Sequence, residues 1–493
     1  MRAAILFALA ATVSVCGCQK PVHFPMESMG DAARLSEAYA AYDPNGDKVA
    51  DFFTYADSAT GRVDRIGFDT TGDGKADSVT RLDDIALHSC RHVVIILDGF
   101  GYDVVKSCWD EGGLRMFYPP SRVIAPYPTM TDPCLEDALG YMACHGIEAA
   151  YFDRRLNRVV GGTGDYLSGR NQPYNRLLDY RADLIWDAIG YIQPCEVFGK
   201  ELNDAKRKLD RADKQEFIAY FVSSAGVGTR LGAVGQRQCL KQVERLVHQM
   251  MWEANGLVKF TLMADHGHTY AKSTRAPLES FLKDKGWRLG GSLKGPNGVV
   301  YAPFGLVTYA SFSTRRPGAL AADLAECEAV ELASYSDHDA VMVVTAGGQR
   351  AVVRHRNGRF KYETLEGDPL QLKAILATLS AHGDAEGYYD PEALLRATAE
   401  HIYPAPLQRL WRAHFGFVEN PPDVICSLKN EFYSGAKGFA GAVSIASTHG
   451  GLNRGNSTTF IMSTIGPLPE LMQSCDIPSR MSRLVGGTWP MNR

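Results

Sequence analysis

One apolar run that ends in an aspartate and a glycine constrains the fold more than any other stretch. Val93 to Leu97 are all apolar and four of the five are β-branched, which is typical of a strand buried on both faces within a parallel sheet. Asp98 and Gly99 follow at once. Open α/β sheets bind ligands beyond the carboxyl ends of their strands. Asp98 is therefore placed for chemistry or, as the alternative, for capping the next helix.

The composition is that of a globular protein with one large domain and smaller attachments. The chain has 493 residues, of which 45% are hydrophobic and 22% charged. A net charge of −4 argues against binding to duplex nucleic acid, which calls for a basic face. Of the eleven cysteines, none stands in a CxxC pair or at a zinc-finger spacing, and disulfide pairing stays open.

The N-terminus resembles a bacterial lipoprotein signal peptide. Arg2 precedes an apolar run from Ala3 to Val15, and Gly17 and Cys18 follow shortly after it. We expect a signal peptide over residues 1–17 and a lipid on Cys18, or alternatively a plain secretory signal. The lipid would contact the membrane, on the periplasmic side of the outer membrane or elsewhere in the cell envelope. Residues 18–40 are expected to form a tether.

Residues 41–85 contain an Asp-rich repeat. Each copy has oxygen-bearing side chains at the first, third, fifth and ninth places of a glycine-containing loop, which suits Ca²⁺. These are Asp43, Asn45, Asp47 and Asp51 in the first copy and Asp69, Thr71, Asp73 and Asp77 in the second. The loops resemble thrombospondin type 3 and dockerin repeats. Two acidic β-turns without an ion are the alternative.

The large domain is expected over residues 86–493. Apolar runs predict further strands at 217–222, 257–264 and 442–448, and a β-rich insertion at about 303–372. Helices are expected at about 103–111, 135–142 and 391–415, and over most of 196–255.

Polar residues follow three of the apolar runs. Asp98 follows the first, Asp265 and His266 follow the run that ends at Ala264, and His449 follows the last. Thr131 lies between them on a proline-bounded turn that opens a helix. Its hydroxyl suits a helix cap or, because helix N-terminal amides bind phosphate, a nucleophile that becomes phosphorylated.

This set resembles the alkaline phosphatase superfamily, most closely its type I phosphodiesterase and nucleotide pyrophosphatase branch. The matching stretches are Ile95-Ile-Leu-Asp98-Gly-Phe, Pro128-Thr-Met-Thr131-Asp-Pro, His145-Gly-Ile147, Ala264-Asp-His-Gly267 and Thr448-His-Gly450. The resemblance implies an α/β fold with a central sheet flanked by helices. It further implies that Asp98, Asp265 and His266 hold one zinc-type ion, that Thr131 reaches the same metal as the nucleophile, and that His449 belongs to a second metal.

The second metal site is degraded. Ala225 stands where the family pattern has an aspartate, and Thr229 where it has a histidine. Zinc sites in proteins use three or four ligands, so His449 alone would not hold an ion tightly. We therefore expect one fully liganded zinc ion.

The resulting expectation is a metal-dependent phosphoester or phosphodiester hydrolase with a threonine nucleophile. The alternatives are a one-metal phosphotransferase of the phosphoethanolamine transferase type and a non-catalytic lipoprotein that keeps the fold. The substrate would be a small phosphate ester, lipid-linked or nucleotide. His268, Lys272 and Arg230 are candidates for an acid, a base or a phosphate clamp, or are surface and capping residues.

Overall fold

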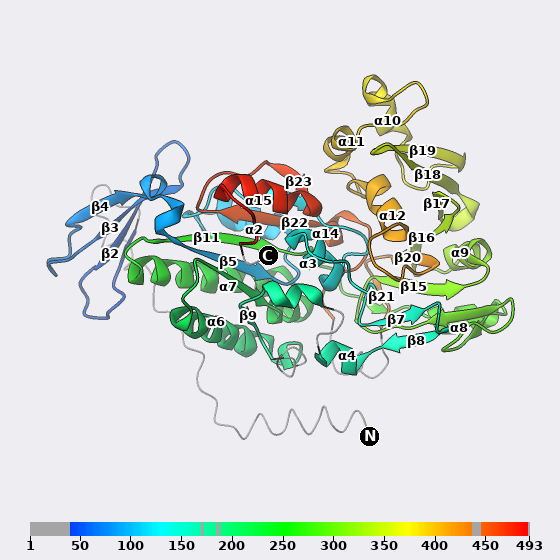
Figure 1. Cartoon of the computed structure of the whole chain (residues 1–493), viewed down its shortest axis with the longest axis horizontal. Helices are drawn as coiled ribbons and strands as arrows, with labels where there is room; N and C mark the ends of the chain where they lie inside the picture. Colours follow the sequence, from blue (N-terminus) through cyan, green and yellow to red (C-terminus); the bar gives the residue numbers. More distant parts are fainter. Residues whose placement is uncertain (1–39, 169–171, 184–185, 187–188, 436–444, 492–493) are drawn as a thin grey trace.

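The computed structural model describes residues 40–168, 172–183, 186, 189–435 and 445–491. The predicted signal peptide, Cys18 and the tether up to residue 39 lie outside these residues. A central sheet lies between a small N-terminal sheet and a second large sheet (Figure 1). In the described part of the chain, no helix combines the length and apolar character that a bilayer crossing requires.

The central sheet has seven strands in the order β23-β6-β22-β11-β5-β10-β9. Only β22 runs antiparallel to its neighbours. The strands are β5 (Arg91–Leu97), β6 (Ser121–Ile124), β9 (Tyr180–Arg181), β10 (Glu216–Phe221), β11 (Val258–Ala264), β22 (Thr458–Ser463) and β23 (Leu471–Gln473). The predicted strands at 93–97, 217–222 and 257–264 are β5, β10 and β11. The expected α/β class is confirmed.

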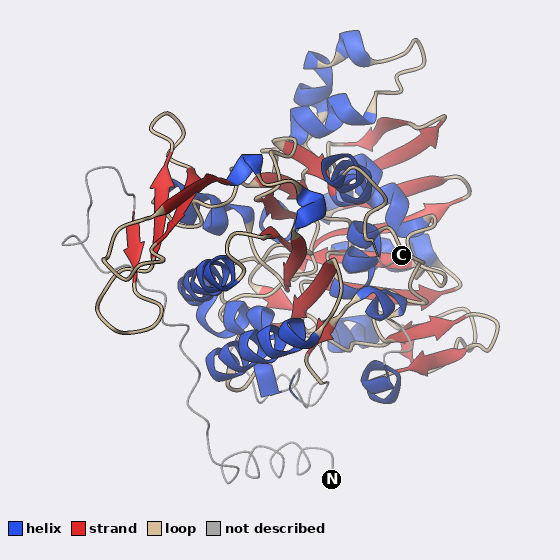
Figure 2. Ribbon diagram, turned by 60° about the vertical axis from the view of Figure 1, so that its left-hand side comes forward, coloured by secondary structure: helices blue, strands red, loops and turns tan. Residues whose placement is uncertain are grey.

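Helices cover both faces of the central sheet (Figure 2). Val93, Ile95 and Leu97 pack on one side with α2 (Tyr102–Asp110), α6 (Pro194–Arg211) and α7 (Ser223–Glu253). Val94 and Ile96 pack on the other side with α3 (Thr131–Leu139) and α15 (Ile477–Val485). The unbroken apolar run of β5 is thereby explained, because both of its faces are buried.

The second sheet has eight strands in the order β13-β14-β15-β20-β16-β17-β18-β19. They are β13 (Arg288–Leu289), β14 (Gly298–Tyr301), β15 (Tyr309–Thr314), β16 (Val330–Asp337), β17 (Ala340–Val344), β18 (Arg350–Arg356), β19 (Arg359–Glu366) and β20 (Val424–Leu428). The β-rich insertion expected at 303–372 is thus part of a larger sheet that also takes strands from both sides of that range.

Helices also cover this second sheet. α8 (Leu278–Asp284) and α9 (Pro317–Ala325) pack on one face. α10 (Lys373–Thr378), α11 (Pro391–Thr398) and α12 (Pro406–His414) pack on the other, in a cluster that also contains Tyr127, Met130 and Leu452. The last three residues come from loops at the edge of the central sheet, so the second sheet supports those loops.

The small sheet comprises β1 (Ala40–Tyr42), β2 (Phe52–Ala56), β3 (Val63–Phe68) and β4 (Ser78–Arg81). Its two Asp-rich loops join β1 to β2 and β3 to β4, and both lie at the same end, where Asp69 N donates to Asp51 O at 3.0 Å. Tyr42 and Phe52 belong to the apolar cluster of the central sheet. The small sheet is therefore packed against the main body.

Two local expectations differ from the structure. The helix expected at 135–142 begins earlier, at Thr131, and ends at Leu139. Of the strand expected at 442–448, residues 442–444 lie outside the described part, and the rest is irregular. Its backbone bonds to the first turns of α7 instead, because Ala446 N donates to Thr229 O at 2.8 Å. The sheet position goes to β22, farther along the chain.

Candidate metal centre

The end of the central sheet brings the predicted ligands together. β5 and β11 are parallel neighbours in which Leu97 pairs with Ala264, so the next residues, Asp98 and Asp265, leave the sheet side by side. β6 ends at the same edge, and the turn after it leads into Thr131. Strand register thus explains how residues distant in sequence form one site.

Asp98, Asp265 and His266 are buried and form a group able to hold a metal ion. Each offers one ligand atom, and these atoms lie within 4.8 Å of one another. His266 Nε2 is 3.6 Å from Asp98 Oδ1 and 3.4 Å from Asp265 Oδ2. The hydroxyl of Thr131 lies 3.4 Å from His266 Nε2 and 3.5 Å from Asp98 Oδ1. The structure therefore brings four of the predicted residues to one point.

His266 presents a lone pair to this point. Its Nδ1 is 3.0 Å from the carbonyl oxygen of Gly267, which only accepts hydrogen bonds, so Nδ1 carries the proton. Burial lowers the pKa of His266 to about 4. The imidazole is therefore neutral near pH 7, with Nε2 free to act as a ligand.

Asp265 has one oxygen in use and one available. Its Oδ1 accepts from the backbone N–H groups of Gly99 and His266, both at 2.9 Å. Its Oδ2 is buried and has no hydrogen-bond donor in the described part of the chain, and burial raises the pKa of Asp265 to about 7. A cation bound at this point would stabilise the ionised form of the carboxylate, which burial disfavours. Two carboxylates, an imidazole nitrogen and a hydroxyl are donors that zinc accepts, so the residues fit the ion.

Tyr220 is a participant that sequence reasoning missed. Its hydroxyl donates to Asp98 Oδ2 at 2.6 Å and its side chain is fully buried. This contact leaves Asp98 Oδ1 to face His266. One feature of the sequence could have identified this residue: Tyr220 lies near the end of a predicted strand that could pair with β5.

Thr131 is the first residue of α3, after Met130 at the N-cap. The structure shows no side-chain hydrogen bond that caps this helix. The hydroxyl of Thr131 therefore points toward Asp98 and His266 instead of satisfying the helix amides. The first turn offers few amides to an anion, because Pro133 has no amide proton and Cys134 N donates to the carbonyl oxygen of Met130 at 2.9 Å.

His449 lies beside the metal group. Its ring stacks on His266 with 4.0 Å between centroids and a 16° interplanar angle, but it is not part of the group of mutually close ligand atoms. Ala225 and Thr229 are buried in the first turns of α7. Neither offers a carboxylate or an imidazole, and among the described residues no second group of three close ligand atoms lies in this region.

The three auxiliary candidates occupy different environments. His268 is fully buried, with Nδ1 2.9 Å from the hydroxyl of Ser447 and its ring 5.6 Å from that of His449. Arg230 donates to the carbonyl oxygen of Tyr191 at 3.3 Å, and Lys272 is exposed. Of the three, only His268 lies next to the histidines of the site.

No family model matches the chain, and no curated protein matches it. Among solved structures, it is similar to human ectonucleotide pyrophosphatase/phosphodiesterase 5, with 11% identity and a TM-score of 0.44 over 81% of this chain and 95% of that one. For murine ectonucleotide pyrophosphatase/phosphodiesterase 5, the identity is 12% and the TM-score is 0.41, over 81% of this chain and 95% of that one. For an inactive variant of the murine protein, in complex with AMP, the identity is 12% and the TM-score is 0.41, over 81% of this chain and 96% of that one.

Proposed function

We propose that this protein is a metal-dependent phosphoester or phosphodiester hydrolase that holds one zinc ion and uses Thr131 as its nucleophile. The observation that supports it most is the position of the Thr131 hydroxyl, 3.4 Å from His266 Nε2 at the start of α3. This hydroxyl shares its surroundings with the ligand atoms of Asp98 and Asp265.

The chemistry follows from these positions. A bound zinc ion lowers the pKa of an adjacent hydroxyl and neutralises phosphoryl oxygens. Thr131 Oγ1 attacks phosphorus, the bond to the leaving alcohol breaks, and a phosphothreonine forms. The backbone N–H of Thr131, at the first position of α3, donates to a phosphoryl oxygen. Water then releases phosphate or a phosphomonoester and restores Thr131.

Metal content and activity together test this function. Purified protein should contain about one zinc ion, and Asp265→Asn should contain none, because it removes a ligand charge but keeps the side-chain shape. Thr131→Ala should lower hydrolysis of a broad phosphoester panel by at least about a thousandfold. The matched control is Thr378→Ala, which alters an exposed threonine of α10.

Each alternative function gives a different result. A phosphotransferase would consume the phosphoester only when an acceptor alcohol is added, and would still depend on Thr131. A non-catalytic protein would bind zinc and leave the whole panel unchanged. A metal-free protein that is inert on the panel would contradict the proposal.

We also propose that the mature chain begins at Cys18 with a lipid attached, as the N-terminal residues suggest. Mass spectrometry of the N-terminal peptide should show an acylated cysteine. Cys18→Ser should abolish that modification, and an unmodified N-terminal peptide in the wild type would contradict it.

A further inference from the structure

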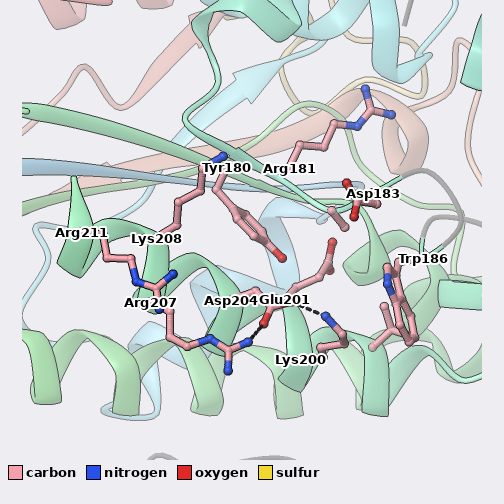
Figure 3. A pocket seen from close by; sticks show the side chains of 12 residues that line it. Tyr180, Arg181, Asp183, Trp186, Lys200, Glu201, Asp204, Arg207, Lys208 and Arg211 are labelled. Atoms are coloured by element: carbon pink, nitrogen blue, oxygen red, sulfur yellow. Dashed lines mark hydrogen bonds and ion pairs between the residues drawn. The ribbon is translucent and has the colours of Figure 1, made fainter. Parts of the chain in front are cut away.

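We propose that a basic groove beside the edge of the central sheet binds a small oligoanion, a molecule that carries two or more phosphate or carboxylate groups. The groove is a cavity of about 440 Å³ between edge strand β9 and helix α6. This volume is within the range of small-molecule sites, about 300–1,000 Å³. Tyr180 and Arg181 form one wall and the side chains of α6 form the other (Figure 3).

Positive charge predominates in the basic groove. Its cationic side chains are Arg181, Lys200, Arg207, Lys208 and Arg211. Its acidic side chains are Asp183, Glu201 and Asp204. Among the described lining residues, five cations against three anions leave an excess of two positive charges, which favours an anionic occupant.

Two of the three acids already have partners within the fold. Glu201 Oε2 accepts from the backbone N–H of Ser223 at 3.1 Å and also from its hydroxyl. Asp204 forms ion pairs with both Lys200 and Arg207, so one carboxylate serves two cations. Figure 3 shows both contacts as dashed lines.

Lys208 and Arg211 supply uncompensated charge. Both are exposed, and within the described residues neither has an acidic partner. Arg181, on the opposite wall, donates to the neutral amide oxygens of Gln172 and Asn175. Arg181 thus lines the cavity from a second element, although Figure 3 shows its guanidinium directed away from the cations of α6.

The simplest alternative is that these cations only complement the dipole of α6. Lys208 and Arg211 do lie in the last turn of α6, where cations are favourable. Lys200 lies in the first half of the helix, however, and Arg181 is on another element. Lys200 Nζ also lies 4.8 Å from the ring of Trp186, which adds an aromatic surface. The helix dipole does not account for these features.

The basic groove is separate from the metal group. The guanidinium of Arg181 lies 5.9 Å from the ring centroid of the buried Tyr220, whose hydroxyl in turn contacts Asp98. Asp98, Asp265 and His266 are not among the described residues that line the groove, so its occupant contacts other side chains. Binding there does not depend on the hydrolase function proposed above.

Calorimetric titration of the full chain with pyrophosphate and with citrate tests the proposal. All proteins carry Thr131→Ala, so that no probe is hydrolysed. Saturable binding with one site is expected, weaker at high salt. Lys208→Glu with Arg211→Glu should lower the affinity at least about tenfold, because two cations become anions and their charged hydrogen bonds to the ligand are lost. Lys283→Glu with Lys285→Glu is the matched control, with exposed lysines in and after α8, and should stay within about twofold.

The two probes separate phosphate from carboxylate ligands. Equal affinity in the groove variant and the control would overturn the proposal. Loss of binding in Asp265→Asn, with retention in the groove variant, would place the anion at the metal group instead. Binding to vesicles of anionic lipid, without binding to either small probe, would show a membrane-contact surface and would also overturn it.

Discussion

Nδ1 of His449 lies 2.8 Å from the carbonyl oxygen of Thr129, two residues before the proposed nucleophile. Because a carbonyl only accepts, the imidazole donates and its Nε2 stays unprotonated. Two further hydrogen bonds join the same segments, from Gly450 N to Thr129 Oγ1 at 2.8 Å and from Thr129 N to Gly450 O at 3.2 Å. The loop of His449 therefore positions the turn that leads to Thr131.

This arrangement predicts a positioning role for His449. His449→Ala should keep about one zinc ion but lose activity, because the turn before Thr131 loses a hydrogen bond and the ring stack on His266. His266→Ala, in contrast, should lose the zinc. Elemental analysis of both variants checks the prediction. Loss of zinc from His449→Ala would instead identify His449 as a ligand.

Tyr220→Phe should weaken zinc binding without unfolding the protein. The substitution removes only the hydroxyl that orients Asp98, and loss of such an outer partner costs about 10–100-fold in metal affinity. Competition with a zinc chelator measures the change. Tyr362→Phe is the control, because its hydroxyl bonds Asp368 in the second sheet. Unchanged zinc affinity would show that Tyr220 does not orient the ligand.

Arg409 holds the loops of the site from α12. It is buried and donates to the carbonyl oxygens of Pro404 at 3.0 Å and Leu452 at 2.9 Å, and to Ser457 Oγ at 2.5 Å. Arg409→Met should cost at least about 3 kcal/mol of unfolding free energy, because several buried acceptors lose their donor.

The Arg409→Met variant should show a lower free energy of unfolding in urea and a weaker affinity for zinc. The control is Arg396→Met, an exposed residue of α11, for which a change within about 0.5 kcal/mol is expected. Equal stability losses in the two variants would refute the role of Arg409.

Acid should loosen the contact between the small sheet and α7. His248 is buried with its ring 4.8 Å from that of Tyr42, and burial lowers its pKa to about 4. The fold prefers the neutral imidazole, so stability is lost as pH falls from about 6.5 to 4, by roughly 3 kcal/mol.

His248→Phe keeps the ring and removes the titration. Its urea midpoint should therefore fall less than that of the wild type between pH 7 and pH 4.5. His338→Phe, at an exposed position, should behave like the wild type. Parallel pH dependence in all three proteins would refute the prediction.

Calcium should stabilise the small sheet through its two Asp-rich loops. Asp43, Asp47 and Asp51 form one group of close carboxylates, and Asp69, Asp73 and Asp77 form another. Burial, together with the charges of neighbouring carboxylates, raises the pKa of Asp51. A cation would offset this repulsion, with a gain of about 2.7 kcal/mol for one site at a hundredfold excess over Kd.

Calcium should therefore raise the unfolding temperature, and Asp47→Ala with Asp73→Ala should abolish the rise. Asp110→Ala is the control, at the end of α2 outside both loops. No shift with calcium in the wild type would mean that the loops are acidic turns without an ion.

Sequence alone predicted the strands that carry the ligands, because β5, β10 and β11 are buried on both faces and are made mostly of apolar residues. Asp98 and Asp265 could be placed because they directly follow such strands. β22 was not predicted, since its first two residues are threonines whose burial depends on the neighbouring strands.

The contacts that orient the side chains of the site could not be predicted from the sequence either. The hydrogen bond from Tyr220 to Asp98 depends on the pairing of β10 with β5. Arg409 binds backbone carbonyls, which have no side-chain pattern in the sequence. Such contacts depend on tertiary register, and local residue patterns do not encode it.

The order of synthesis has a consequence for this site. β6 pairs with β22 and β23, which are made last. A nascent chain that has already produced Asp98, Thr131, Asp265 and His266 therefore still exposes the edge of β11 and lacks partners for β6. Exposed strand edges favour aggregation. A chain that ends before Thr458 would contain every proposed zinc ligand but not β22 and β23, the strands that join β6, and so the turn to Thr131, to the rest of the sheet.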